Sequence, residues 1–318
     1  MSNYVTVPEA AEILRRSRDV GIICHRRPDG DTLGSAYALW ACLGKMGIRS
    51  RILCCDEVTP NFSVLKNPYL EKADESFDPL TYIAVDVASE KMMGSYEPLA
   101  QRCVLCIDHH GSNTRYAQNL LLDPGAAACC EIIWDVIACL GVEADGYIAA
   151  AVYIGVSTDT GCFRFRNTTR RTHEVAAETM RYEFGVGEIN NRLFEQKSRK
   201  MLALEKAALD SAEFFFDGAV TLITLTSETI AATGAGPEEF DGISAFARTI
   251  EGVEVGVTIR QTGEDSYKVS VRSRNVDSAA ICAAFGGGGH HGAAGCDVAG
   301  TRLDELKTRL LEEIGKSL

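Results

Sequence analysis

The side chains of this chain that could do chemistry fall into four short clusters of aspartate and histidine. They are His25-x-x-x-Asp29-x-Asp31, then Asp86, then Asp108-His109-His110, then Asp159. Carboxylate oxygens and imidazole nitrogens without thiolates suit Mn²⁺ or Mg²⁺ better than a structural zinc site. The clusters hold enough ligands for a pair of divalent cations, which is the chemistry of metal-assisted phosphoester hydrolysis.

The elements that must position these clusters are short apolar strands alternating with helices. Strands are predicted at 20–24, 51–54, 82–85 and 104–107, and helices at 32–46, 126–140 and 145–157. This alternation predicts a parallel sheet with helices on both faces, in which ligands gather beyond the carboxyl ends of the strands. His25, Asp86 and Asp108 each follow a strand directly, and the Thr-Gly turn after Asp159 can bring the chain back to the same place.

Each cluster also has an ordinary structural explanation when taken alone. Asp29 could stabilise a turn while Asp31 caps the following helix, and Asp86 or Asp159 could cap a turn. However, Asp86 closes a buried apolar run, where a carboxylate is costly without a cation or hydrogen-bond donors. Three consecutive titratable residues at 108–110 are equally hard to explain as core filling. Taken together, the clusters favour a metal site.

Length and pattern predict two α/β domains. At 318 residues with 46% hydrophobic content, the chain can bury two cores. A polar helical segment is followed by a β-rich region with two further helices. The predicted organisation is an N-terminal parallel-sheet domain over residues 1–187, a connector helix over 188–212 and a smaller C-terminal α/β domain over 213–318.

Composition excludes several classes of protein. A formal net charge of −12 disfavours binding to long duplex nucleic acid but allows a small anionic substrate. No apolar run approaches the roughly 18 residues of a membrane span, and no secretory signal is evident, so a cytoplasmic protein without a membrane partner is expected. The 12 cysteines are expected to be reduced core residues, including Cys103-x-x-Cys106 in a predicted strand.

The second domain offers groups for an anionic substrate. Arg272 and Arg274 close a predicted strand, where a guanidinium could bind a phosphate or stack on a base, although Arg274 could equally be a solvated charge. A glycine run could bring backbone N–H groups against an anion. It comprises Gly286, Gly287, Gly288 and Gly289, followed by His290. It lacks the Lys-Ser/Thr of an NTPase phosphate loop, which disfavours ATP hydrolysis.

The order of these motifs resembles that of the DHH/DHHA1 phosphoesterase superfamily. The similarity runs through the aspartate and histidine clusters to Gly-Gly-Gly-Gly-His-x-x-Ala-Ala-Gly near the C-terminus, and covers almost the whole chain. Within the superfamily the chain is most similar to the oligoribonuclease and 3′-phosphoadenosine 5′-phosphate (pAp) phosphatase type. The resemblance implies a DHH domain followed by a DHHA1 substrate-binding domain.

The resemblance also implies a role for each site residue. One metal would be held by His25, Asp29 and Asp86, and the second by Asp31, Asp86, His109 and Asp159, with Asp86 bridging. His110 would face the phosphoryl group, and Asp108 would orient a histidine through its ring N–H. The substrate would contact Arg272, Arg274, His290 and the glycine run. Two divalent cations, Mn²⁺ or alternatively Mg²⁺, would activate a hydroxide without a covalent intermediate.

The expected function is hydrolysis of very short oligoribonucleotides to mononucleotides, dephosphorylation of pAp to AMP, or both. A phosphodiesterase of cyclic or linear dinucleotides is an alternative with the same core. RNA, DNA fragments, pAp and cyclic dinucleotides all present a phosphate and a base, so the sequence leaves them unranked, and it leaves a homodimer open.

Three other classes fit less well. A manganese pyrophosphatase would carry a Ser-Arg-Lys-Lys-Gln motif in its second domain, which has no equivalent here. A non-catalytic nucleotide sensor would be expected to have lost metal ligands, whereas every matching position is filled. A nicotinamide oxidoreductase would need a Gly-x-Gly-x-x-Gly after the first strand, and none is present.

Overall fold

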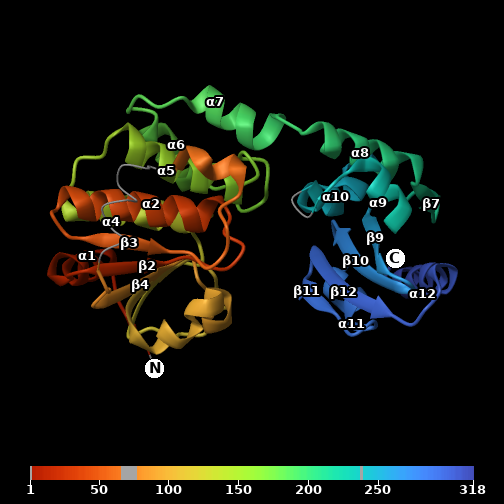
Figure 1. The fold of residues 1–318 in the computed structure, drawn as a ribbon, viewed down its shortest axis with the longest axis horizontal. Coiled ribbons are helices and arrows are strands. Elements are labelled where there is room, and N and C mark those ends of the chain that lie inside the picture. Colours follow the sequence, from red (N-terminus) through yellow and green to blue (C-terminus); the bar gives the residue numbers. More distant parts are fainter. Residues whose placement is uncertain (1, 66–76, 237–238) are drawn as a thin grey trace. The chain divides into compact units, whose positions relative to one another are not determined.

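The computed structural model describes residues 2–65, 77–236 and 239–318, which form two compact units. The chain divides between Gln196 and Lys197. Each unit contains one six-stranded sheet with helices on both faces (Figure 1). None of the helices in the described ranges combines the length and apolar character needed to cross a bilayer.

The sheet of the first unit is parallel throughout, as predicted. Its strands are short and mostly buried, because helices or helical turns cover both faces. In sheet order the strands are β1 (Asn3–Tyr4), β6 (Asn119–Leu122), β5 (Cys103–Asp108), β4 (Thr81–Val85), β2 (Val20–Ile23) and β3 (Ser50–Leu53).

Two hydrophobic cores flank this sheet. The larger core lies on the face covered by α-helices, and the smaller core packs the 3₁₀ segment η2 against the other face. Most side chains of the larger core come from α1 (Val7–Arg16), α2 (Gly30–Lys45), α4 (Cys129–Leu140) and α5 (Gly146–Asp159), and helices α6 (Arg170–Thr179) and α7 (Val186–Asn190) add Val175, Ala176 and Ile189. The remaining helical elements are η1 (Pro60–Leu65), η2 (Glu90–Arg102) and η3 (Asn191–Glu195).

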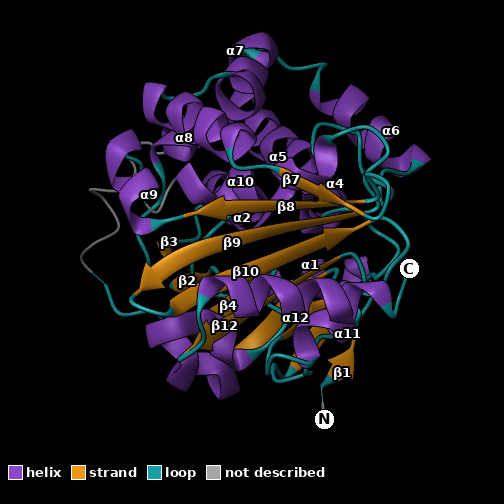
Figure 2. Cartoon of the chain, turned by 90° about the vertical axis from the view of Figure 1, so that its right-hand side faces the viewer, coloured by secondary structure: helices purple, strands orange, loops and turns teal. Residues whose placement is uncertain are grey.

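The second unit has a mixed sheet (Figure 2), in which only the β8–β9 pairing is parallel among the described strands. In sheet order its strands are β11 (Gly288–His290), β12 (Ala293–Ala299), β10 (Ser266–Ser273), β9 (Val255–Gly263), β8 (Val220–Leu225) and β7 (Glu213–Phe215). One core contains side chains of α11 (Ser278–Ala283) and α12 (Leu303–Gly315). The other contains side chains of α8 (Arg199–Asp210), α9 (Ser227–Thr233), α10 (Phe240–Phe246) and η5 (Ala247–Thr249).

The segment expected to be one connector helix over 188–212 is interrupted. After α7 and the π-helical turn η3, Gln196 and Ser198 adopt extended backbone angles. Ser198 then caps α8, because its hydroxyl accepts a hydrogen bond from the backbone N–H of Met201 at 2.9 Å. The interruption coincides with the division between the two units.

Candidate metal centre

Three adjacent strands of the first unit deliver the predicted ligands to one edge of the sheet. His25 lies two residues beyond the end of β2, Asp86 directly follows β4, and Asp108 is the last residue of β5. The backbone N–H of Asp86 donates to the carbonyl of Ile107 at 2.9 Å, which ties the ends of β4 and β5 together. As predicted, the site therefore lies beyond the carboxyl ends of parallel strands.

Helices α2 and α5 bring the remaining carboxylates to this edge because they pack unusually closely. A Cβ atom added at Gly155 would lie 2.2 Å from Cys130 Sγ and 2.8 Å from Asp31 Oδ1. One added at Gly30 would lie 2.2 Å from Thr158 Oγ1. These contacts leave no room for a larger residue, so glycine on both helices is what places Asp31 deep in the site.

The first group of ligands is His25, Asp29 and Asp86. The Nε2 atom of His25 lies 3.4 Å from Asp29 Oδ1 and 3.5 Å from Asp86 Oδ2. Asp29, and not Asp31 as in the structural alternative considered from the sequence, is the N-cap of α2, and its Oδ1 accepts the N–H groups of Asp31 and Thr32. One carboxylate thus caps the helix and contributes to the candidate metal site.

The second group is Asp31, His109 and Asp159. The Nε2 atom of His109 lies 3.8 Å from Asp31 Oδ2 and 3.4 Å from Asp159 Oδ2. Asp31 is fully buried, and its oxygens accept the backbone N–H groups of Cys129 and Cys130 at 2.6 and 2.9 Å. These two amides lie in the first turn of α4, where the helix dipole favours a carboxylate.

Asp86 lies between the two groups. Its Oδ2 faces His25, and its Oδ1 lies 3.5 Å from His109 Nε2. The side chain is buried, yet Oδ1 accepts no hydrogen bond. Its backbone has φ = 58°, a strained conformation for a residue with a side chain. A buried carboxylate with one oxygen toward each group is the arrangement that a bridging ligand requires.

Backbone carbonyls orient both candidate histidine ligands. The Nδ1 atom of His25 lies 2.9 Å from the carbonyl oxygen of Arg26, and that of His109 lies 3.1 Å from the carbonyl oxygen of Ala126. An Nδ1–H donated to a carbonyl leaves the Nε2 lone pair free for a cation. In both residues Nε2 is the atom that faces the carboxylates.

His110 is held differently, through Asp108. Its Nδ1 lies 2.8 Å from Asp108 Oδ1, while Asp108 Oδ2 accepts the side-chain amide of Asn113 at 2.6 Å. Asn113 was not among the predicted site residues, because an asparagine in a polar turn carries no distinctive signal. The Asp108 carboxylate is fully buried, and its Oδ1 also accepts the backbone N–H of His109 at 2.8 Å.

Several carboxylates of the site are buried close together, so their negative charges repel one another in the absence of a cation. Burial and the neighbouring Asp31 raise the pKa of Asp86, and burial also raises the pKa of Asp31. Burial with repulsion from Asp31 raises the pKa of Asp159 to about 9. Burial opposes the charged form of His25, but hydrogen bonds to Asp29 and Asp86 outweigh it and raise its pKa to about 11. Divalent cations would remove this repulsion.

The donor set fits divalent cations. In each of the groups His25–Asp29–Asp86, Asp31–His109–Asp159 and Asp86–His109–His110, the ligand atoms lie within 4.8 Å of one another. The first of these groups is the set that the resemblance implies for one metal, and the second contains three of the four ligands implied for the other. The fourth is Asp86, whose Oδ1 accepts no hydrogen bond and has a lone pair free for a cation. The residues present could therefore hold two cations.

The predicted substrate-binding residues of the second unit occupy one end of its sheet. Arg272 lies on β10 and pairs with Ala293 of β12, which in turn pairs with His290 of β11. Arg274 is exposed, and its Nε donates to the carbonyl of Val253 at 3.0 Å.

The glycine run is only partly the open loop that was expected. Gly288 and Gly289 belong to β11, and the N–H of Gly287 donates to the carbonyl of Cys282 at 2.9 Å. A Cβ atom at Gly287 would lie 2.3 Å from the carbonyl oxygen of Gly295, so close packing alone accounts for this glycine. A Cβ atom at Gly288 would meet nothing within 4 Å.

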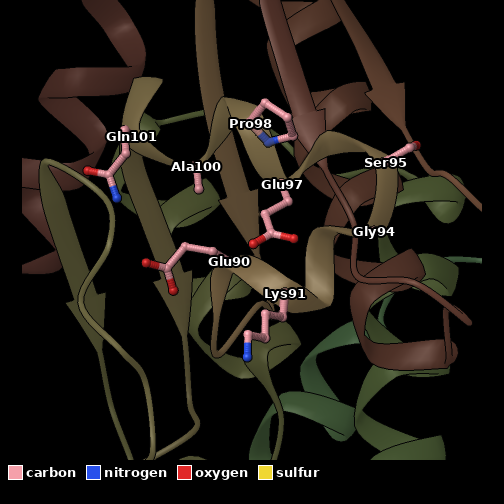
Figure 3. Close-up of a pocket in the computed structure, with 8 residues that line it drawn as sticks. All are labelled: Glu90, Lys91, Gly94, Ser95, Glu97, Pro98, Ala100 and Gln101. Atoms are coloured by element: carbon pink, nitrogen blue, oxygen red, sulfur yellow. The ribbon is translucent and has the colours of Figure 1, made fainter.

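A surface depression in the first unit is lined entirely by residues of η2 (Figure 3). It contains Glu90, Lys91 and Glu97 but neither histidine nor any of the metal-ligand candidates. The Glu90 carboxylate already accepts a hydrogen bond from Thr114 at 2.7 Å. The candidate metal centre is thus defined by its ligand geometry and lies apart from this depression.

Comparison with known proteins decides the family. The DHH family, N-terminal domain, matches residues 19–156, and the DHHA1 domain matches residues 225–316. A bifunctional oligoribonuclease and PAP phosphatase NrnA from Thermus thermophilus is 34% identical over 97% of this chain and 93% of its own length. This chain belongs to the DHH/DHHA1 family. The resemblance and the fold class predicted from the motifs are confirmed.

A second relative agrees in sequence, and two solved structures agree in fold. The protein of the same name from Bacillus subtilis is 26% identical over 87% of this chain and 89% of its own length. An exopolyphosphatase-related protein from Bacteroides fragilis has the same fold, with a TM-score of 0.87 and 20% identity over 98% of this chain and 95% of that one. RecJ from Thermus thermophilus, solved with Mn²⁺, has a TM-score of 0.56 at 15% identity over 98% of this chain and 55% of its own.

Proposed function

We propose that this chain is a metal-dependent phosphohydrolase that cleaves very short oligoribonucleotides to mononucleotides and dephosphorylates pAp to AMP. The observation that carries the proposal is the convergence of two ligand groups on Asp86, whose two oxygens face opposite groups. Relatives at 34% and 26% identity, named as bifunctional oligoribonucleases and PAP phosphatases, support the choice of substrate. The net charge of −12 also favours short substrates over long nucleic acid.

Two divalent cations, Mn²⁺ or Mg²⁺, would be held at the site. His25, Asp29 and Asp86 would bind one, and Asp31, His109 and Asp159 the other, with Asp86 shared. Bound there, the cations would neutralise charge on the phosphoryl oxygens and acidify a water for attack on phosphorus.

His110 would donate a hydrogen bond to the phosphoryl group. The hydrogen bond to Asp108 raises the pKa of His110, and the nearby negative charges act in the same direction. The imidazole is therefore cationic over a wider pH range than an ordinary histidine, and a charged donor binds an oxyanion more strongly than a neutral one. Its side chain is 37% exposed, so a substrate can reach it.

Turnover of pAp and of a diribonucleotide by the full chain with Mn²⁺ tests the proposal. Release of orthophosphate and AMP from pAp, and of mononucleotides from the diribonucleotide, is expected. Asp86→Asn should lower both rates by at least about 10³-fold, because the loss of cation binding costs several kcal/mol of transition-state stabilisation.

The matched control is Asp123→Asn, which removes the same charge from an exposed turn just after β6. Its rates should equal those of the wild type. No hydrolysis of either substrate by the wild type, with Mn²⁺ or Mg²⁺, would reject the proposed function, and full activity of Asp86→Asn would remove Asp86 from the mechanism.

A further inference from the structure

Two arginines of the second unit, Arg248 and Arg272, form what we call the arginine corner. Arg272 lies on β10, and its Nη2 donates to Ser244 Oγ at 3.2 Å while its Nη1 donates to the carbonyl of Val271 at 3.1 Å. Arg248 lies on η5, and its Nη1 donates to the carbonyl of Ser273 at 3.4 Å. Both guanidinium groups are thus anchored at the end of the same strand.

Backbone packing brings Arg248 to this position. Gly256 of β9 lies opposite Arg272 in the antiparallel register. A Cβ atom at Gly256 would lie 2.6 Å from the backbone nitrogen of Arg248, so η5 rests directly on the strand beside Arg272. Burial lowers the pKa of Arg272, and the positive charge of Arg248 lowers it further. The two cations are therefore close enough to repel each other.

Neither arginine has an acidic partner within the described part of the chain. Carboxylate ion pairs are present elsewhere, as between Arg49 and Asp19 or Arg171 and Asp135, but none involves Arg248 or Arg272. Two half-buried guanidinium groups side by side repel each other unless an anion compensates them. Their hydrogen bonds to neutral groups leave this charge unbalanced.

The sheet beside the corner is open. Residues paired across β10, β12 and β11 share a face. The row at Arg272 contains Ala293 and His290, and the row two residues earlier contains Ser270, Gly295 and Gly288. The residues of the second row are small, and a Cβ atom at Gly288 would meet nothing within 4 Å. A ligand can therefore lie flat on this face with its anionic end at the two guanidinium groups.

We propose that Arg248 is a substrate-binding residue that acts with Arg272 to bind a phosphate monoester of the nucleotide. Planar guanidinium groups form paired hydrogen bonds with phosphate oxygens, and two of them match the charge of a terminal phosphate. The inference rests on the proposed function for the identity of the substrate. It implies that a nucleotide with a terminal phosphate binds more tightly than the corresponding unphosphorylated nucleoside.

Equilibrium binding of AMP and adenosine to the full chain in EDTA tests this inference without turnover. The wild type should bind AMP more tightly than adenosine. Arg248→Gln should weaken AMP binding by at least about 10-fold, because a hydrogen bond between charged groups is lost, and leave adenosine binding unchanged. With Mn²⁺, the same variant should raise KM for pAp and change kcat little.

Two further variants complete the test. Arg302→Gln removes the same charge from the 81%-exposed side chain at the start of α12 and should leave AMP affinity unchanged. Arg248→Lys keeps the charge and should bind AMP with intermediate affinity, which tests the role of Arg248 even if Arg248→Gln fails to fold. If both Arg248 variants bind AMP as tightly as the wild type does, the inference is overturned.

The outcome is separable from that of the proposed function. A wild type that hydrolyses pAp, with Arg248 variants of normal AMP affinity, would leave the function standing and reject the subsite. If the wild type hydrolyses neither substrate but its AMP affinity depends on Arg248, the proposed function is rejected and the subsite stands. A wild type that shows no preference for AMP over adenosine would reject the subsite whatever its activity.

Discussion

The candidate metal centre of the first unit and the arginine corner of the second carry unbalanced charge of opposite sign. The metal centre gathers four carboxylates, on Asp29, Asp31, Asp86 and Asp159, around its histidines. The arginine corner gathers two guanidinium groups with no acidic partner among the described residues. Each region thus lacks a counter-ion, a metal in one case and a phosphate in the other.

The two regions differ in burial, and this difference decides what the missing ion does. Asp31 and Asp86 are almost completely buried, whereas Arg248 and Arg272 are only half-buried. Removing a carboxylate from water is expensive, while a partly exposed guanidinium keeps much of its hydration. We therefore expect the metal to contribute to the stability of the first unit, and the phosphate to affect binding far more than stability.

The largest expected effect is stabilisation by Mn²⁺. At a free concentration 100 times the dissociation constant, a ligand specific for the folded state adds about 2.7 kcal/mol to the free energy of unfolding. Thermal unfolding with EDTA or Mn²⁺ should show this as a rise in the first unit's Tm, which Asp86→Asn should largely remove. A comparable rise in Tm when AMP is added in EDTA would show that the two regions do not differ in this way.

The effect of Mn²⁺ should grow with pH. The pKa values of Asp31, Asp86 and Asp159 are raised in the folded, metal-free protein. These groups therefore contribute fully to the free energy of unfolding below their unfolded pKa of roughly 4, and the contribution is lost as pH rises from there through their folded pKa values. His25, with its pKa raised to about 11, is stabilising below its unfolded value and loses this contribution as pH rises toward 11. Metal-free stability should therefore fall from pH 5.5 to 8.5, while the Mn²⁺-induced rise in Tm increases. The opposite trend would contradict the assignment of these residues as ligands.

The strand-end residues could be predicted because their signal is local. A buried apolar run followed by aspartate or histidine fixes both the strand and the place where the polar group emerges, as at Val85–Asp86 and Ile107–Asp108. The parallel sheet then brings such ends together without further information. The family motifs led to the same residues.

Features that depend on contacts between distant segments could not be predicted. Asn113 holds Asp108 only because the turn after β5 folds back, and nothing in the sequence around Asn113 distinguishes it. The approach of Arg248 to Arg272 depends on η5 packing on Gly256, and the strand at 288–290 depends on pairing with β12. In each case tertiary packing, not local propensity, determines the structure.

Gly155→Ala tests whether helix packing sets the metal ligands. The added methyl group would overlap Cys130 Sγ of α4 and crowd Asp31 Oδ1 of α2, so α5 must move away from these helices or the carboxylate must turn. We expect a loss of roughly 1–3 kcal/mol in the free energy of unfolding and weaker Mn²⁺ binding, measured by thermal unfolding and metal titration. Gly187→Ala, where a Cβ meets nothing within 4 Å, is the matched control. Normal Mn²⁺ affinity in Gly155→Ala would show that the ligands do not depend on this packing.

Asn113→Ala should have the smallest effect, because it acts on the metal centre only through Asp108 and His110. Loss of the 2.6 Å hydrogen bond should let the Asp108 carboxylate rotate away from His110, whose pKa should then fall toward its ordinary value because the bond to Asp108 is what raises it. We expect kcat for pAp to fall by about 10-fold, as for other residues that orient active-site groups, with Mn²⁺ affinity nearly unchanged. Because protonated His110 is the proposed donor, activity should also decline at a lower pH than in the wild type. Asn119→Ala is the control: the Asn119 amide donates to the Val104 carbonyl on β5 at 2.7 Å and to no other group among the described residues, so this variant should show neither change. A lower kcat with an unshifted pH profile would mean that Asn113 supports the turn after β5 without setting the charge on His110.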